Sequence, residues 1–318
     1  MVHPRCAWPA LALKLHYARG IICIRLLISA ISFISGNQPT HGAAMLLNRF
    51  LKGLLSGFKS TTRTPNTTTS RASGTTSLAS PEEIGRFAFD QSLDVSADIK
   101  GKYGFDGELV EIYASNKRQL IHKWHHYIPI YDRYFSSFRT KKIRFLEIGV
   151  SKGGSLNMWR KYLGDDAIIY GIDIDPGCYA FNGISGQVRI GSQDDPAFLQ
   201  SVITEMGGVD IVLDDGSHRM DHIRNSLKYL FPRLNLGGIY LIEDLHTAYW
   251  PSWGGGYLAP SNFFGFVSEL IDDMHHWYHW QGSTHPEISE FCTAVHIHDS
   301  IAVLEKNRVY RPTHSQIV

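Results

Sequence analysis

From about residue 143 the chain alternates short, continuously apolar runs with segments whose apolar residues recur at helical spacing. The apolar runs lack the polar alternation of a strand that faces water on one side, so we expect strands buried on both faces, as in a parallel sheet. The predicted strands are residues 143–150, 167–175, 187–192, 209–215 and 238–244. The predicted helices are residues 154–163, 195–206, 219–231 and 261–277.

Two further apolar segments, residues 293–299 and 300–306, follow with almost nothing between them, which indicates a closing antiparallel pair. Repeated strand–helix units that end in such a pair predict an α/β fold. We expect a doubly wound sheet of seven strands, with its ligand crevice at the carboxyl ends of the strands. Residues 82–140 have a helical pattern and are predicted to form a cap before the sheet domain of residues 141–318.

The first 81 residues form a basic leader that differs in charge from the remainder. Nine of the 31 lysines and arginines lie there, and no acidic residue precedes Glu82, so the remainder carries 22 basic and 30 acidic residues. An acidic body argues against nucleic acid as a partner. Residues 60–81 are rich in Ser and Thr and are predicted to be disordered.

Two apolar stretches of the leader bear on location. Residues 20–36 are apolar but contain Arg25, and residues 45–59 are apolar at helical spacing, so membrane contact through the leader stays an option. Whether residues 1–44 belong to the working protein is also open. The four cysteines, Cys6, Cys23, Cys178 and Cys292, show no paired spacing. A reducing compartment is therefore favoured, and we expect a cytoplasmic protein, with membrane association through the leader as the alternative.

Polar groups and glycines gather where the predicted strands end. The first strand runs into a glycine-rich turn, whose candidates for cofactor binding are Glu147, Gly149 and Gly153. Asp173, at the end of the second strand, is placed to hold ribose hydroxyls. After the third strand, Gln193 and Asp195 are candidates for contact with an adenine. For the acid, capping of the following helix is an equal alternative, because a proline comes next.

Several motifs together resemble class I S-adenosylmethionine-dependent methyltransferases. They are FLEIGVSKGGSLNMWR, GIDIDP, VDIVLDDGSH, LFPRLNLGGIYLIEDLHTAYWP and HDSIAVLEK. Within that class the chain is similar to the metal-dependent sugar O-methyltransferases of the mycinamicin and rhamnosyl type, over about residues 103–308. The resemblance implies a Rossmann-like fold, S-adenosylmethionine and Mg²⁺ as cofactors, and methyl transfer to a sugar hydroxyl.

The segment HHYIPIYDRYF, residues 125–135, is similar to the family's region for substrate binding and oligomer contact. A sugar or glycoside substrate and a homo-oligomer are therefore expected. Where the family commonly has Thr-Asp-Lys upstream of this segment, the chain has Ser115, Asn116 and Lys117.

Four carboxylates at two strand ends are the candidate metal ligands. Asp214 and Asp215 end the fourth strand, and Glu243 and Asp244 end the fifth. Neighbouring strands lie about 4.8 Å apart, so acids from both can reach one hard cation such as Mg²⁺. Because alternate residues of a strand point opposite ways, not all four can be ligands. We expect Asp214, Glu243 and Asp244 to bind, with Asp215 as the substitute, and we count Asp214 also as a cofactor contact.

Two histidines lie beside these acids. His246 follows the fifth strand, and the ordinary pKa of histidine suits a general base at neutral pH, so it is the first candidate for the catalytic residue. His218, in DDGSH, is the second candidate, as a base or as a contact to metal or substrate. The aromatic loop TAYWPSWGGGY could stack on a sugar or pack on the cap. HHWYHW, residues 275–280, is interpreted as a partly exposed helix end or a dimer contact.

Three other functions remain as alternatives. A nicotinamide-dependent dehydrogenase shares the fold, but its usual G-x-G-x-x-G fingerprint does not occur in the first turn. A hydroxylase-like member of the same broad family would bind iron in place of Mg²⁺. A scaffold that binds S-adenosylmethionine without catalysis is the third. Neither the acceptor sugar nor the hydroxyl position follows from the sequence.

Overall fold

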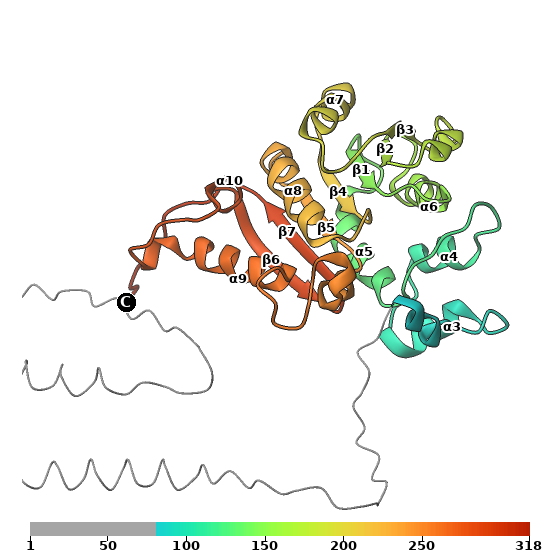
Figure 1. The fold of residues 1–318 in the computed structure, drawn as a ribbon, viewed down its shortest axis with the longest axis horizontal. Coiled ribbons are helices and arrows are strands. Elements are labelled where there is room, and N and C mark those ends of the chain that lie inside the picture. Colours follow the sequence, from blue (N-terminus) through green and yellow to red (C-terminus); the bar gives the residue numbers. More distant parts are fainter. Residues whose placement is uncertain (1–80) are drawn as a thin grey trace, which may run out of the picture. The chain divides into compact units, whose positions relative to one another are not determined.

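The computed structural model describes residues 81–318, which include every predicted strand and helix (Figure 1). Residues 1–80, and with them the predicted disorder and membrane contact of the leader, lie outside the described residues. From residue 81 onwards, no helix has the length and the apolar character needed to cross a membrane. Cys178 and Cys292 are both buried free thiols.

Seven strands form one mixed sheet in the order β3-β2-β1-β4-β5-β7-β6. Strands β1 to β5 are parallel, and β7 pairs antiparallel with β5 and β6. The strands are β1 (Arg144–Ile148), β2 (Ile168–Asp173), β3 (Gln187–Ile190), β4 (Ile211–Asp214), β5 (Ile239–Ile242), β6 (Cys292–His298) and β7 (Ile301–Lys306). The predicted doubly wound, Rossmann-like sheet with its closing antiparallel pair is confirmed.

Helices connect and flank these strands (Figure 1). The α-helices are α3 (Val95–Tyr103), α4 (Glu108–Ala114), α5 (Tyr127–Phe135), α6 (Gly154–Leu163), α7 (Pro196–Met206), α8 (Met220–Leu230), α9 (Phe263–Met274) and α10 (Pro286–Ser289). The 3-10 helices are η1 (Pro81–Phe87), η2 (Ser136–Phe138), η3 (Pro176–Phe181), η4 (Phe231–Arg233), η5 (Leu245–Tyr249), η6 (Pro251–Trp253) and η7 (His276–Tyr278).

Local signals set several of these boundaries. Asp195 caps α7 by accepting from two backbone N–H groups, and Pro196 occupies the first helical position. Helix α8 ends at Leu230, two residues before Pro232, because proline cannot continue the hydrogen-bonded ladder. Helix α9 stops at Met274, before the end predicted for it, and the following residues form the short η7.

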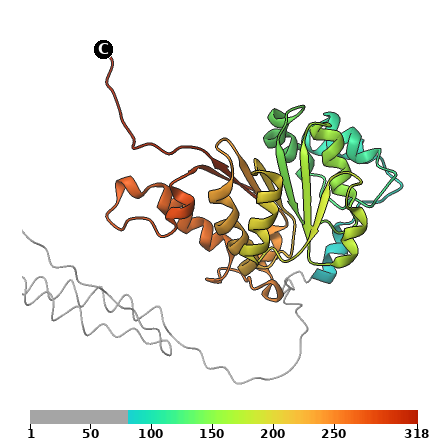
Figure 2. The ribbon, with the colours of Figure 1, turned by 90° about the horizontal axis from the view of Figure 1, so that it is seen from above.

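The two faces of the sheet bury two separate groups of apolar side chains. On one face, α7, α8 and α9 pack against side chains of the strands, among them Val212 and Ile242. On the other face, α3 to α6 pack against the alternate side chains, among them Leu213 and Leu241. Figure 2 shows the sheet with helices on both sides. Alternate residues of β4 and β5 are therefore buried on opposite faces, which explains their continuously apolar sequences.

The segment predicted as a cap shares its core with the sheet. Tyr127, Tyr131 and Phe135 of α5 are fully buried, and Tyr131 and Phe135 each make edge-on contacts with Trp159 of α6. These contacts fix α5 on α6, and hydrogen bonds from Lys123 to Glu243 and from Tyr127 to Asp244 hold the start of α5 and the loop before it at the carboxyl ends of the central strands. The segment thereby supplies two side chains to the site described next.

Candidate active site

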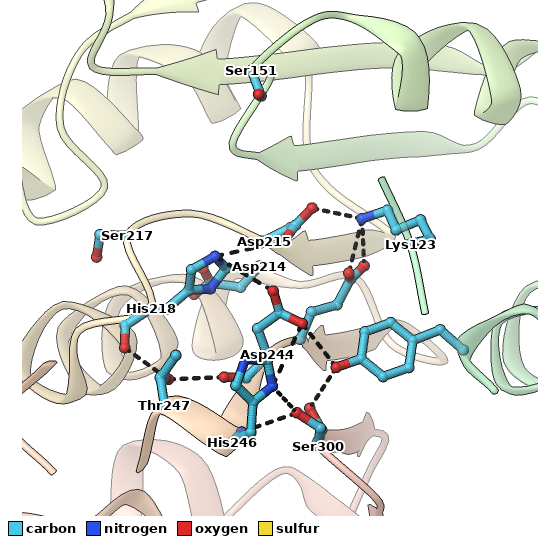
Figure 3. A network of polar contacts seen from close by, with 12 residues as sticks. Lys123, Ser151, Asp214, Asp215, Ser217, His218, Asp244, His246, Thr247 and Ser300 are labelled. Atoms are coloured by element: carbon cyan, nitrogen blue, oxygen red, sulfur yellow. Dashed lines mark hydrogen bonds and ion pairs between the residues drawn. The ribbon is translucent and has the colours of Figure 1, made fainter. Parts of the chain in front are cut away.

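The carboxyl ends of β4 and β5 carry the acids that the sequence singles out. Asp214, the last residue of β4, pairs in register with Ile242, the last residue of β5. The backbone N–H of Glu243 donates to the carbonyl of Asp214 at 2.9 Å, so the segments that follow β4 and β5 stay side by side beyond the ends of the strands. Asp215 from one strand and Asp244 from the other then face a common space (Figure 3).

A buried lysine, Lys123, lies between the acids of the two strands. Its Nζ donates to Oδ2 of Asp215 at 2.6 Å and to the two carboxylate oxygens of Glu243 at 3.0 and 2.8 Å. The side chains of Lys123 and Glu243 are only 2% and 1% exposed. Burial alone would lower the pKa of Lys123, but the charges of Asp215, Glu243 and Glu147 outweigh it and raise the pKa above its ordinary value. The site thus contains a permanent positive charge.

Asp215, His218 and Asp244 have the composition and spacing of metal ligands. Each places one ligand atom within 4.8 Å of the other two. Nε2 of His218 lies 3.9 Å from Oδ1 of Asp215 and 3.7 Å from Oδ2 of Asp244, and the three side chains point toward one another (Figure 3). These distances are too long for hydrogen bonds. Two carboxylate oxygens beside an imidazole nitrogen can hold Mg²⁺, Mn²⁺ or Fe²⁺, so the residues present fit a divalent metal.

The backbone is strained at two of these residues. His218 and Asp244 have positive φ angles of 56° and 54°, a left-handed conformation that non-glycine residues seldom adopt. Each residue follows a strand closely, and the conformation turns the chain sharply there. Strain of this kind persists where the surrounding structure enforces it, most often at functional sites.

Asp244 has a partner on each side of its carboxylate. Oδ1 accepts from the hydroxyl of Tyr127 at 2.8 Å and lies 3.9 Å from Nδ1 of His246, while Oδ2 faces His218. Burial alone would raise the pKa of Asp244, but the two histidines and the hydrogen bond from Tyr127 lower it below its ordinary value. Asp244 is therefore ionised at neutral pH and available to a cation.

His246 is held in place by two hydrogen-bond contacts with Ser300 and by two aromatic rings. Its Nδ1 lies 2.7 Å from Oγ of Ser300, which also accepts from the backbone N–H of His246 at 2.9 Å. The rings of Trp124 and Trp250 meet the imidazole edge-on, with centroids 5.5 and 4.9 Å away. Burial lowers the pKa of His246 and Asp244 partly offsets this, so the imidazole is neutral at neutral pH.

Asp214, which we expected to bind metal and cofactor, is not brought into this group. Its carboxylate is 1% exposed and accepts from Ser226 Oγ at 2.8 Å, from the Tyr240 hydroxyl at 3.0 Å and from Gln193 Nε2 at 3.1 Å. Burial raises the pKa of Asp214, although the three donors oppose the change. The carboxylate joins α8, β5 and the loop after β3, and the substitute, Asp215, takes the position at the crevice.

Two residues predicted to bind the cofactor shape the turn after β1. Gly149 has φ 96°, and a Cβ atom there would lie 2.0 Å from the carbonyl oxygen of Asp215, so only glycine fits. Oδ2 of Asp173 accepts from the backbone N–H groups of Val150 and Ser151, both at 2.9 Å. Its Oδ1 accepts from the backbone N–H of Asp175. Asp173 thus ties the end of β2 to the turn after β1.

Gly153, the third predicted glycine position, precedes α6. It has φ 73°, and a Cβ atom there would lie 2.6 Å from the ring of Phe181. Both glycines are therefore required by backbone conformation and by a close neighbour.

Three other predicted cofactor residues have structural roles. Glu147 is fully buried and accepts from Ser155 Oγ and Trp159 Nε1, and burial raises its pKa to about 7. Gln193 donates to Asp214 and accepts from the backbone N–H of Ser217 at 2.7 Å. Asp195 caps α7, which was the alternative interpretation.

Two cavities meet at this site. The first, of about 270 Å³, is lined by Gly149, Asp173, Asp215, His218 and Glu243, among others. Glu147, Gly153, Gln193, Asp195 and Asp214 do not line it. The second, of about 1300 Å³, lies under η1 and α3 and reaches His246, Trp250 and Ser300. Residues 120–124 line both cavities, so Lys123 and Trp124 stand at their junction.

The family of the sheet domain follows from a comparison with known proteins. Residues 146–245, from β1 to the start of η5, match the family model described as a methyltransferase domain. Residues 146–245 are thus similar to a methyltransferase domain. The methyltransferase domain includes the glycine turn, Asp173, and all the acids of β4 and β5.

Curated relatives of the methyltransferase domain act on glycosides, according to their names. The chain is 36% identical over 214 residues to the 8-demethyl-8-(2-methoxy-alpha-L-rhamnosyl)-tetracenomycin-C 3'-O-methyltransferase of Streptomyces olivaceus, covering 64% of this chain and 54% of that protein. It is 32% identical over 249 residues to the mycinamicin VI 2''-O-methyltransferase of Micromonospora griseorubida, covering 71% and 59%. The chain thus spans little more than half the length of these relatives.

A solved structure supports the same fold. The MycE methyltransferase in complex with Mg, SAH and mycinamycin VI is similar to this chain with a TM-score of 0.55 and 31% identity, covering 68% of this chain and 54% of that one.

The sequence analysis missed Lys123 and Tyr127. Lys117, the lysine that aligns with the family's Thr-Asp-Lys, is exposed, whereas Lys123 reaches the acids from a position six residues later. Lys123 stands directly before an aromatic and histidine-rich run, and a lysine in such an apolar setting is a signal for a buried charge with partners. Tyr127 lies within residues 125–135, which were singled out only as a segment, and nothing marks this tyrosine among the others there because buried tyrosines are common in helices.

The remaining sequence candidates lie away from the acids. Trp250 packs on His246, and Trp253 packs on Trp250 with centroids 5.4 Å apart. In HHWYHW, three histidines hydrogen-bond to carbonyl groups at the end of α9, as follows: His275 to Ile271, His276 to Asp273 and His279 to Asp272. The carbonyls of Asp272 and Asp273 also accept from the backbone N–H of His275, which caps the helix. The rings thus add to the capping of the helix end, which accounts for the cluster without a metal.

Proposed function

We propose that this protein transfers a methyl group from S-adenosylmethionine to a hydroxyl group of a sugar or glycoside, assisted by a divalent metal. In this reaction the C–S bond of the sulfonium breaks, an O–C bond forms, and the hydroxyl proton passes to a base. The observation that carries the proposal is the group of Asp215, His218 and Asp244 beside the junction of the two cavities. Methyl donor and acceptor would meet there.

The first cavity suits the methyl donor. Gly149 lets the backbone approach a ligand closely, and Asp173 lies at the end of β2, where dinucleotide-type folds hold ribose hydroxyls. S-adenosylhomocysteine, the product form of the donor, is present in the similar MycE structure. We assign donor binding to the side of the first cavity that Gly149 and Asp173 line. Glu147, Gln193 and Asp195 do not line this cavity.

The residues of the site also suit Mg²⁺, which the MycE structure contains. Asp215 and Asp244 would hold the ion, with Glu243 beside Asp215 through their shared contact with Lys123. A bound divalent ion stabilises the negative charge that develops on a reacting hydroxyl oxygen. The protein contributes a fixed pair of carboxylates, and Tyr127 orients one of them by its hydrogen bond to Asp244.

We propose His218 as the base that accepts the hydroxyl proton, ahead of His246, and leave Asp215 and Asp244 of this group as the residues that would hold the ion. His218 lines the first cavity, keeps Nε2 out of hydrogen-bonding range of both acids, and stands on a strained backbone. His246 is bonded through Nδ1 to Ser300, is packed between two tryptophans and lines only the second cavity. We assign to His246 the positioning of the acceptor.

The second cavity favours a glycoside over a free sugar as the acceptor. Its volume of about 1300 Å³ exceeds the range of roughly 300–1,000 Å³ that is usual for small-ligand pockets. Its wall includes Phe87, Phe89, Tyr103 and Trp124, which can cover an apolar aglycone. The relatives' names, which describe rhamnosyl and macrolide substrates, point to the same class. Self-association and membrane contact stay predictions of the sequence.

The test is methylation of a panel of deoxysugar glycosides by the full chain, with isotope-labelled S-adenosylmethionine and mass spectrometry. We expect a gain of one labelled methyl group that depends on Mg²⁺ and disappears with EDTA. Donor binding without methylation of any acceptor would favour the scaffold. Addition of an oxygen atom, dependent on iron and dioxygen, would favour the hydroxylase.

The base is tested with His218→Ala and His246→Ala, with His275→Ala as a control in an exposed helix end. We expect His218→Ala to lose at least about 10²-fold in turnover, as general-base variants do, while it keeps donor affinity. His246→Ala should chiefly raise the KM for the acceptor. The reverse pattern would assign the base to His246.

A further inference from the structure

The position of Lys123 is unusual for a lysine, because its charge is buried among candidate metal ligands. Its Nζ lies 2.6 Å from Asp215 and 2.8 Å from Glu243, and its side chain is 2% exposed. Removing an ammonium group from water is unfavourable unless ionised partners surround it, and here three carboxylate oxygens do so. The ammonium group of Lys123 therefore lies between the acids that follow β4 and β5, where a metal ion could otherwise bind.

The site holds more carboxylates than cations. Asp215, Glu243 and Asp244 meet there, and Lys123 donates to the first two. A divalent cation beside Asp215 and Asp244 would add to the positive charge that Lys123 already supplies. Without Lys123 the same ion would leave an uncompensated carboxylate in a buried place, which is costly to the fold but attractive to a cation.

Asp215 connects the lysine to the metal group. Oδ2 accepts from Lys123, whereas Oδ1 faces His218 in the group that also contains Asp244. A divalent ion held by Asp215 would share that carboxylate with the ammonium group of Lys123, and the two positive charges would repel each other. The effect of Lys123 on a divalent ion is therefore direct, through a shared ligand and over a few ångströms.

We propose that Lys123 is a resident cation of the metal site, which partly neutralises the pair of Asp215 and Glu243 when no metal is bound and weakens the binding of a divalent metal. This inference rests on the proposed function only in taking Asp215 and Asp244 as metal ligands. Lys123 is a positioning residue in this account. It keeps the acids folded together in the metal-free protein and limits metal affinity, so that bound metal can exchange.

The experiment compares the full-length wild type with Lys123→Met by two measurements that need no substrate. Mn²⁺ binding is followed by electron paramagnetic resonance, with Mn²⁺ as a probe for the oxygen-rich site, and thermal unfolding is followed with EDTA and with saturating Mn²⁺. We expect Lys123→Met to bind Mn²⁺ at least about tenfold more tightly, because a repelling charge is removed. We also expect it to unfold at a lower temperature in EDTA and to regain most of that loss with Mn²⁺.

Two matched variants separate this effect from general changes in charge. Lys152→Met removes a positive charge from a residue that lines the same first cavity but makes none of the three contacts. Lys123→Arg keeps the charge. Both should bind Mn²⁺ with an affinity within about threefold of the wild type, a difference of under 1 kcal/mol.

Each remaining outcome would overturn the inference in a distinct way. Unchanged or weaker Mn²⁺ binding by Lys123→Met would mean that the lysine supports the metal or does not affect it. An equal increase in Mn²⁺ affinity in Lys152→Met would mean that the effect arises from the net charge of the protein and not from the position of Lys123. Absence of Mn²⁺ binding in the wild type and in Lys123→Met would refute the metal site itself, and with it the metal-assisted function.

Discussion

Replacement of Glu147 by glutamine tests whether this buried acid serves the fold or the cofactor. Glu147 lies at the next-to-last position of β1, is fully buried and does not line the first cavity. Glutamine has nearly the same shape, and its amide can accept from Trp159 and donate to Ser155. The substitution therefore removes the possibility of a negative charge while the two hydrogen bonds can be kept.

The size of the effect follows from the pKa of Glu147. Burial raises the pKa from 4.5 to about 7, with Asp215 adding to the increase and Lys123 opposing it. The folded protein therefore holds the proton more tightly than the unfolded chain. The stability from this group is fully present below pH 4.5 and is lost as the pH rises to about 7. At about 1.4 kcal/mol per pH unit, this loss amounts to roughly 3 kcal/mol.

The assay is urea unfolding of the wild type and Glu147→Gln in EDTA, between pH 4 and pH 8. Since glutamine does not titrate, the free energy of unfolding of the variant should rise by about 3 kcal/mol relative to that of the wild type as the pH increases across this range. Its affinity for S-adenosylmethionine should stay within about threefold of the wild type. A difference in stability that is constant with pH would refute the assigned pKa. Loss of donor binding by a stable variant would return Glu147 to the cofactor site.

Two further substitutions test the turn and the acids. Gly149→Ala should destabilise the protein by about 2 kcal/mol or more and weaken donor binding, because alanine is strained at φ 96° and its Cβ would displace the carbonyl of Asp215. Thermal unfolding and titration with S-adenosylmethionine measure the two effects. A fully stable variant with normal donor affinity would contradict the prediction. Asp215→Asn should weaken Mn²⁺ binding at least about tenfold. Asp214→Asn should change Mn²⁺ binding by less than about threefold and should instead lower the free energy of unfolding. A larger effect of Asp214→Asn on Mn²⁺ binding would show that the two aspartates were assigned the wrong way round.

The centre of the sheet was predictable because β1, β2, β4, β5 and β7 are buried on both faces, unlike the edge strands β3 and β6. Continuous apolar runs of four to eight residues, separated by helical periods, have few other solutions, and all seven predicted strands are present. The helix over residues 154–163 was predicted with its observed bounds, since Gly153 and Gly164 flank it. Helix α9 was predicted too long, because the aromatic and histidine residues after Met274 continue the apolar pattern although the chain turns there.

The site was predictable as a place but not in its details. The sequence puts four acids at two strand ends, and the structure brings three of them to one crevice. Which of two consecutive aspartates faces the crevice depends on the direction of the last residue of β4. That direction is fixed by Ser226, Tyr240 and Gln193, which hold Asp214 from three different elements. No local pattern records such a long-range set of donors.

The adjacent acids Glu243 and Asp244 illustrate how the fold tolerates charges that repel each other. The positive φ of Asp244 turns the chain between them, so the two carboxylates meet different partners. Burial raises the pKa of Glu243 well above its ordinary value, and Lys123 opposes this by donating to both of its carboxylate oxygens. Asp244 is stabilised by Tyr127 and the two histidines. One acid thus already has a cation supplied by the protein, while the other keeps an oxygen that faces only His218. A site built in this way would hold its acids together without a metal and still offer a negatively charged oxygen of Asp244 to a metal ion. These are the properties expected of a site from which a bound metal can exchange.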